Sequence, residues 1–123
     1  MDIRIFKTKG FGIVAKKALI TDVELFTAIQ EVMQGQADDL GGGVWKKRLN
    51  ENRHRSIILA KGRSYWVYQF LFAKKDQGNI SKKELGAFRA LAKAYESLSD
   101  EQVQLMLDRK DFMEIRDGEE IQK

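Results

Sequence analysis

The apolar positions of the first 35 residues predict a strand followed by two helices. Residues 3–7 alternate loosely between apolar and polar side chains, which is typical of a strand. The segment 11–19 changes to helical spacing and places on one face Phe11, Val14, Ala15 and Ala18. Thr21 can cap a second helix, because Glu24 stands three residues later and completes a capping box.

This second helix should end near Gly35 and pack against the first as a helical hairpin. Its inner face is predicted to hold Leu25, Ile29, Val32 and Met33.

The middle of the chain reads as sheet. The glycines at 41–43 would break any helix, and the predicted sheet begins directly after them. Three strands are predicted, at about 44–50, 56–61 and 64–74, and the short turn at 61–63 favours a hairpin between the last two. The continuous apolar run 57–60 indicates a central strand that is covered on both faces.

Two further helices are predicted near the C-terminus, each beginning at a serine cap. Ser81 with Glu84 begins the third helix, and Ser99 begins the fourth. Their inward-facing residues are predicted to be Leu85, Phe88, Leu91, Ala92 and Tyr95, then Val103, Met106 and Leu107. Residues 112–115 can form a short closing strand, and a polar tail follows at 116–123.

The resulting order β-α-α-β-β-β-α-α predicts a small α+β fold with a mostly antiparallel β-sheet. We expect one domain at 1–115, containing a basic sheet at 44–76 and a C-terminal helical extension at 81–110.

No run of about 18 apolar residues and no signal-like leader is present, so we expect no membrane contact and a cytoplasmic location. Without cysteine there is neither a disulfide nor a thiol nucleophile.

Charge changes this picture, because the net value of +4 conceals a strong asymmetry. Residues 44–76 contain nine Lys and Arg against two acids, and six aromatic side chains lie among them. Residues 96–123 contain nine acids and four bases. A cationic, aromatic-rich sheet suits a polyanion with stackable bases, which favours RNA as the partner. A solvated outer face of an ordinary sheet is the alternative.

Several kinds of site find little support. The glycine triplet is followed by a strand rather than by the Lys-Ser/Thr and helix of a phosphate-binding loop, so it more simply supplies turn geometry. One histidine and no cysteine predict no metal site, and we expect no cofactor. Asp38 and Asp39 fit a solvated loop better than a cation site, and no serine is suitably spaced for a hydrolase triad.

The remaining chemistry lies in basic residues that could converge at one edge of the sheet: Lys46, Lys47, Arg48, Arg53, His54, Arg55, Lys74 and Lys75. Metal-free RNA cleavage needs a base for the 2′-hydroxyl, fixed cations for the phosphorane and an acid for the 5′-oxygen. Lysines crowded by other cations and an imidazole can supply these groups. The same residues would equally serve phosphate binding without catalysis.

Three segments of the chain resemble the RelE/HigB-type toxins of bacterial type II toxin–antitoxin systems, in the subfamily with an extended helical C-terminus. They are 40–49 (LGGGVWKKRL), 66–80 (WVYQFLFAKKDQGNI) and the helical stretch 84–102. The resemblance implies a microbial-ribonuclease-like α+β fold and cleavage of mRNA, often in the ribosomal A site. It also implies a cognate antitoxin with a helix-turn-helix domain.

The resemblance also implies roles for individual residues. Arg55 matches the arginine of the family's Gly-Tyr-Arg motif, and Lys74 matches the lysine of its Phe-Ala/Pro-Lys segment. We expect both to stabilise the phosphorane, with Lys47 or His54 as the proton-transfer group, and His54 favoured. The residues expected to bind RNA are Lys46, Arg48, Arg53, Lys75 and Tyr68.

Two departures from the family pattern keep other functions open. Only 49–54 connects the basic strand to Arg55, where the family usually has a longer Gly- and Lys-rich segment, and the base-stacking tyrosine of other RelE-type toxins is absent near Ile80. A catalytically weakened protein that binds its antitoxin or RNA without cleavage is therefore one alternative. A ParE-like inhibitor of DNA gyrase is another, since that family shares the fold, although the basic sheet favours RNA.

Overall fold

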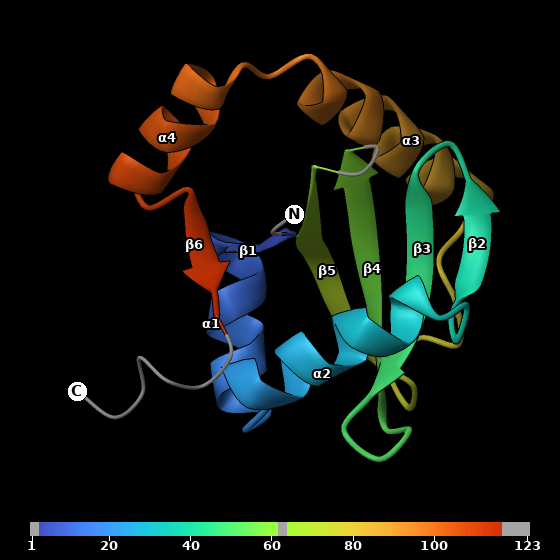
Figure 1. Ribbon diagram of the computed structural model, residues 1–123. Coiled ribbons are helices and arrows are strands. Elements are labelled where there is room, and N and C mark those ends of the chain that lie inside the picture. The colour runs from blue at the N-terminus through green and yellow to red at the C-terminus, as the bar shows by residue number, and fades with distance from the viewer. Residues whose placement is uncertain (1–2, 62–63, 117–123) are drawn as a thin grey trace.

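A six-stranded mixed sheet forms the centre of the computed structural model, which describes residues 3–61 and 64–116 (Figure 1). The strands are β1 (Arg4–Thr8), β2 (Asp38–Gly41), β3 (Val44–Leu49), β4 (His54–Lys61), β5 (Tyr65–Ala73) and β6 (Phe112–Ile115). The helices are α1 (Lys9–Lys17), α2 (Asp22–Met33), α3 (Lys82–Glu96) and α4 (Asp100–Asp108).

The strands lie in the order β2-β3-β4-β5-β1-β6. Strands β1 and β5 are parallel, and every other neighbouring pair is antiparallel. The predicted α+β class with a mostly antiparallel sheet is therefore confirmed. Strand β4 is internal, and the side chains of Ile57, Ile58 and Leu59 are buried as the apolar run predicted.

Local side-chain chemistry explains where the helices begin. Thr21, Ser81 and Ser99 accept hydrogen bonds from the third backbone N–H of α2, α3 and α4, as predicted. The capping box predicted at Thr21 is wrong, because the Glu24 carboxylate accepts from the backbone N–H of Asn50 instead. Helix α1 begins two residues earlier than predicted, because the Thr8 side chain accepts from the N–H of Phe11 and caps it.

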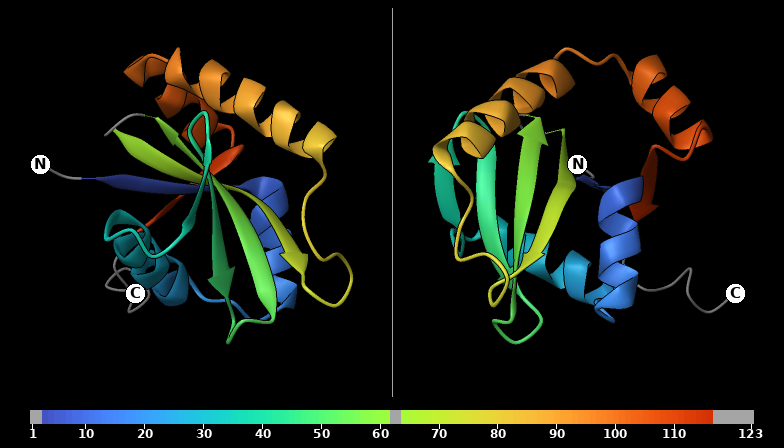
Figure 2. Two further views of the ribbon diagram at one scale, coloured as in Figure 1. Left: turned by 90° about the vertical axis from the view of Figure 1, so that its right-hand side faces the viewer. Right: turned by 180° about the vertical axis from the view of Figure 1, so that it is seen from behind.

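The helices cover the two faces of the sheet (Figure 2). Helices α1 and α2 pack on one face around a core that includes Phe11, Leu25 and Tyr68. Helix α3 covers the other face near β3 and β4, and its predicted inner residues contact Val44, Ile57 and Phe72. Helix α4 and strand β6 enclose a third cluster around Phe6 and Phe112.

A β-bulge in β5 decides which side chains meet which helices. Ile57 pairs with Phe70 and Ile58 pairs with Tyr68, so Gln69 has no partner on β4. The extra residue shifts the alternation: Tyr68 and Leu71 face the α1/α2 core, whereas Phe70 and Phe72 face α3.

Several expectations need correction. Strand β2 was not predicted; it ends at Gly41, and Gly42 and Gly43 form the turn into β3. All three glycines have positive φ, at 83°, 66° and 83°. The predicted inward residues Val14 and Met33 are 41% and 40% exposed, because α1 and α2 meet at a corner instead of lying side by side (Figure 1).

Two predicted segments lie at least partly outside the described residues. The turn at 61–63 includes the undescribed residues 62–63, and most of the polar tail lies in 117–123. Among the described residues, none of the helices has the length and apolar character to span a bilayer.

Candidate functional site

The predicted basic residues lie at one end of strands β3, β4 and β5, but strand alternation divides them between two faces. Arg48 is opposite Arg55, which is opposite Phe72, so these three side chains share the face covered by α3. The next row contains Leu49, His54 and Ala73, and Leu49 belongs to the α1/α2 core. Arg55 and His54 therefore project from opposite faces of the sheet.

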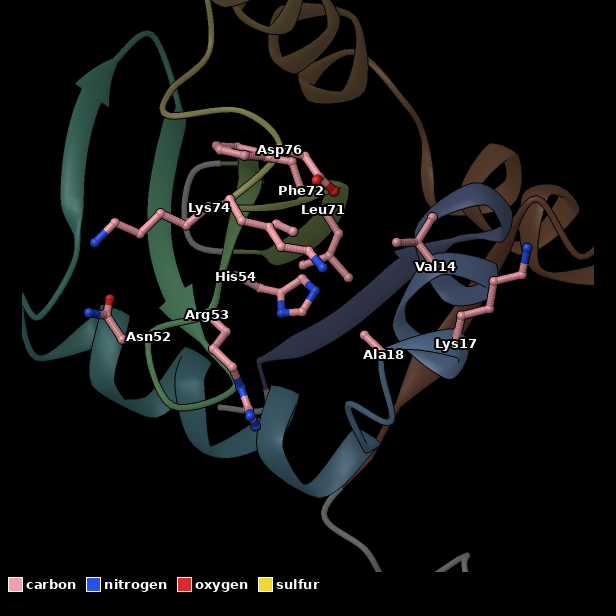
Figure 3. Close-up of a pocket in the computed structure, with 12 residues that line it drawn as sticks. Val14, Lys17, Ala18, Asn52, Arg53, His54, Leu71, Phe72, Lys74 and Asp76 are labelled. Carbon is pink, nitrogen blue, oxygen red and sulfur yellow. The ribbon is translucent and has the colours of Figure 1, made fainter.

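A pocket of about 900 Å³ opens beside this end of the sheet, between the strand ends and α1 (Figure 3). We call it the strand-end pocket. Its lining consists of Val14, Lys17 and Ala18 from α1 and its C-terminal cap, Asn52, Arg53 and His54 around the start of β4, and Leu71, Phe72, Ala73, Lys74, Lys75 and Asp76 at the end of β5.

The lining of this pocket is both cationic and apolar. Its lining includes four cations and one acid, so the local charge is positive: Lys17, Arg53, Lys74 and Lys75 against Asp76. Val14, Ala18 and Leu71 supply an apolar wall. The half-buried ring of His54 projects into the pocket, toward α1 (Figure 3).

The turn that leads into His54 has an unusual backbone conformation. Asn50, Glu51 and Asn52 all adopt left-handed backbone conformations, with φ of 55°, 54° and 70°. Asparagine tolerates this region better than other non-glycine residues. The backbone N–H of Asn50 donates to the Glu24 carboxylate of α2 at 2.5 Å, which ties the turn to that helix. Glu24, which lies in the first turn of α2, therefore anchors the loop at Asn50 to this helix.

The side chain of Arg55 is buried behind the same turn. It is 8% exposed, and its Nη1 donates to the backbone oxygens of Asn52 at 3.0 Å and His54 at 3.1 Å. Arg55 does not line the strand-end pocket with Lys74. Its guanidinium supports the turn that presents His54.

Lys46 and Lys47 use their ammonium groups within the protein. Lys47 forms an ion pair with Glu31 of α2 at 2.9 Å and donates to the backbone oxygen of Gln36 at 3.0 Å. Lys46 lies 3.2 Å from the Asn79 side-chain oxygen and 3.7 Å from Asp38. By contrast, Arg48 is exposed, and within the described part of the chain it forms no ion pair.

The position of Tyr68 contradicts its predicted contact with RNA, because the side chain lies in the core. Its side chain is fully buried, and its hydroxyl donates to the backbone oxygen of Leu25 at 2.8 Å. Burial, with smaller effects of Glu24 and Glu31, raises the pKa of Tyr68 well above its ordinary value. The bulge at Gln69 places Tyr68 in the α1/α2 core, where no base can reach it.

One comparison with known proteins identifies the family. Residues 3–115 match the family model described as the RelE toxin of the RelE / RelB toxin-antitoxin system. The chain belongs to the RelE toxin family. No curated protein and no solved structure matches it. Within residues 3–61 and 64–116, no three His, Cys, Asp or Glu side chains form a group that could hold a metal ion.

Sequence reasoning missed part of the strand-end pocket. Val14 and Ala18 were expected on the inner face of the first helix and Lys17 was not singled out, because only the tertiary fold brings α1 beside β5. Asn50 was missed as well, although an asparagine directly after a strand is a common turn signal. Of the four predicted catalytic residues, the structure brings His54 and Lys74 together in the pocket.

Proposed function

We propose that this RelE-family protein is the toxin of a type II toxin–antitoxin pair and a metal-independent endoribonuclease. Its substrate is mRNA, cleaved in the ribosomal A site, and it acts in the cytoplasm. The observation that carries the proposal is the strand-end pocket, where His54 and Lys74 lie among further cations and beside an apolar wall. That combination fits a nucleotide, which presents a charged phosphate next to a flat base.

Each part of the pocket has a role in this proposal. Lys17, Arg53, Lys74 and Lys75 attract the backbone phosphates, and the apolar wall receives a base unstacked from its neighbours. During cleavage the 2′-oxygen bonds to phosphorus and the bond from phosphorus to the 5′-oxygen breaks. Negative charge grows on the phosphorane oxygens, where Lys74 and the His54 ring can stabilise it.

Mapping of mRNA 5′ ends after induction tests the proposal. Expression of the wild type should arrest growth and produce new 5′ ends within translated regions, whereas a Lys74→Ala variant should produce fewer. Lys93→Ala on α3 is the matched control, because Lys93 is exposed and does not line the strand-end pocket. Intact transcripts in growing cells that contain the folded wild type would contradict the proposal.

A second candidate is a non-catalytic RelE-family protein that only binds its antitoxin. It is favoured by the internal contacts that occupy the charged groups of Lys46, Lys47 and Arg55, all predicted to face RNA. This candidate predicts antitoxin binding without growth arrest. It is eliminated if the wild type arrests growth and Lys74→Ala relieves the arrest.

We further propose a helix-turn-helix antitoxin as the partner, in keeping with the toxin–antitoxin description of the family. An acidic segment of the antitoxin would be attracted to the same cationic surface as RNA. A small helix-turn-helix gene directly beside the toxin gene would support the pairing, and co-purification of the two products would test it.

A further inference from the structure

The side-chain amide of Asn50 contacts the only histidine of the chain. Asn50 Nδ2 lies 3.2 Å from His54 Nδ1. A contact between an amide and an imidazole can run in either direction, because both groups can donate or accept. The proton positions therefore depend on what fixes the orientation of the amide.

Arg53 fixes that orientation. Its Nη2 lies 3.1 Å from the Oδ1 of Asn50, and a guanidinium can only donate. The amide oxygen must therefore face Arg53, and the amide N–H₂ must face the ring. His54 Nδ1 accepts this hydrogen bond, so in the neutral ring the proton is on Nε2.

Asn50 itself is held on several sides. Its N–H donates to Glu24 at 2.5 Å, and its backbone oxygen accepts from Arg53 Nε at 3.2 Å. The left-handed φ of 55° is a conformation that asparagine adopts readily. The amide is thus presented to His54 by an ordered turn.

We propose that Asn50 is a positioning residue that holds His54 in the Nε2–H tautomer, so that the ring donates a hydrogen bond into the strand-end pocket. This inference rests on the proposed function and refines it. A neutral ring with its proton on Nε2 cannot take the proton of a 2′-hydroxyl, because its other nitrogen is occupied by Asn50. It can donate to a non-bridging oxygen of the phosphorane.

The tautomer excludes neutral His54 as the base, so solvent water carries the protons of cleavage. The bond between O2′ and phosphorus forms, and the bond between phosphorus and O5′ breaks. Water takes the proton of the 2′-hydroxyl and another water molecule protonates the 5′-oxygen, while His54 keeps its own proton. This role differs from the proton transfer that the residue type alone favoured.

Nitrogen NMR of the full-length protein tests the tautomer directly, and a single histidine makes the signals unambiguous. At alkaline pH the wild type should show a protonated Nε2 and an unprotonated Nδ1. Asn50→Asp should move the proton to Nδ1, because a carboxylate only accepts. Asn52→Asp is the control: it adds the same charge in the same turn, also at a left-handed residue, and should keep the wild-type tautomer. A wild-type Nδ1–H tautomer, or an unchanged spectrum in Asn50→Asp, would overturn the inference.

A second measurement separates hydrogen-bond donation from proton transfer. His54→Gln keeps an N–H donor without acid–base chemistry, so it should retain cleavage within about tenfold of the wild type, whereas His54→Ala should lose roughly a hundredfold or more. If His54→Gln and His54→Ala both unfold at the same urea concentration as the wild type and lose cleavage activity equally, the donor role is refuted. If the wild type cleaves no RNA, the proposed function fails, while the NMR result still decides the tautomer.

Discussion

Lys17 extends the cationic lining of the strand-end pocket from the sheet onto α1. If its ammonium contacts an RNA phosphate, Lys17→Ala should weaken binding of all RNA sequences alike and reduce the slope of log affinity against log salt by about one. Fluorescence anisotropy with a labelled single-stranded RNA at several salt concentrations measures both quantities. Lys16→Ala is the control, because Lys16 is exposed on the same helix but lies outside this pocket. Equal behaviour of the two variants would show that α1 does not contact RNA.

Tyr68 contributes to stability, in contrast to the RNA-binding role expected from the sequence. Tyr68→Phe removes the hydrogen bond from its hydroxyl to the Leu25 oxygen and should lower the free energy of unfolding by about 1 kcal/mol. Urea unfolding measures this loss. RNA affinity, measured by anisotropy, should not change, because the ring lies in the core. A variant with normal stability and weaker RNA binding would contradict this assignment.

Residue types identified the candidate groups, but only tertiary contacts show which of them are available. The sequence pointed to His54 and Lys74, and both line the strand-end pocket, while their catalytic roles stay predictions. It could not show that Lys47 pairs with Glu31 or that Arg55 turns back onto its own turn, since both depend on where α2 and the 50–53 turn lie. The face of Tyr68 was equally out of reach, because a one-residue bulge in β5 reverses the alternation along this strand.

Helices were more predictable than strands because their ends are determined locally. The caps at Thr21, Ser81 and Ser99 involve residues three positions apart, which any reading of the sequence can find. Strand β2 has the sequence Asp-Asp-Leu-Gly, which has little strand propensity, and it forms because the glycine turn returns the chain onto β3. The anchoring contact of Glu24 with Asn50 is likewise tertiary.

Strand β6 is fastened to β1 by an ion pair that should make its docking sensitive to acid. Arg4 donates two hydrogen bonds of 2.9 Å to Glu114, and this contact holds the pKa of Glu114 below its ordinary value. A carboxyl with a lowered folded-state pKa contributes stability above its unfolded-state pKa. It loses that contribution as pH falls through the folded-state value.

Glu114→Gln should therefore lower the free energy of unfolding at pH 7 by about 0.5–1 kcal/mol and reduce the further loss between pH 7 and pH 2. Urea titrations at several pH values measure both effects. Glu101→Gln on α4 is the matched control, because Glu101 is exposed and forms no ion pair among the described residues. An acid dependence of Glu114→Gln identical to that of the wild type would show that the pair does not stabilise β6.

Charge is distributed unevenly along the chain, with a basic segment at 44–76 and an acidic segment at 96–123. The net charge of +4 alone would attract RNA or an acidic antitoxin only weakly and without preference for a face. On the proposed function, a localised cationic pocket instead directs both RNA and the antitoxin to the same place. On the proposed function, the antitoxin therefore neutralises the toxin by occupying the surface that RNA needs.

This competition predicts a position-specific effect of charge. Reversing Lys74 and Lys75 to glutamate should slow association with both RNA and the antitoxin, and should weaken the dependence of each on-rate on salt. Reversing Lys82 and Lys83 to glutamate changes the net charge equally, but both residues are exposed at the start of α3 and outside the pocket, so the on-rates should fall much less. Stopped-flow mixing over a range of salt concentrations measures the rates. Equal slowing by the two double variants would mean that net charge alone steers the encounter; slowing of RNA but not of antitoxin would mean that the antitoxin binds a different surface.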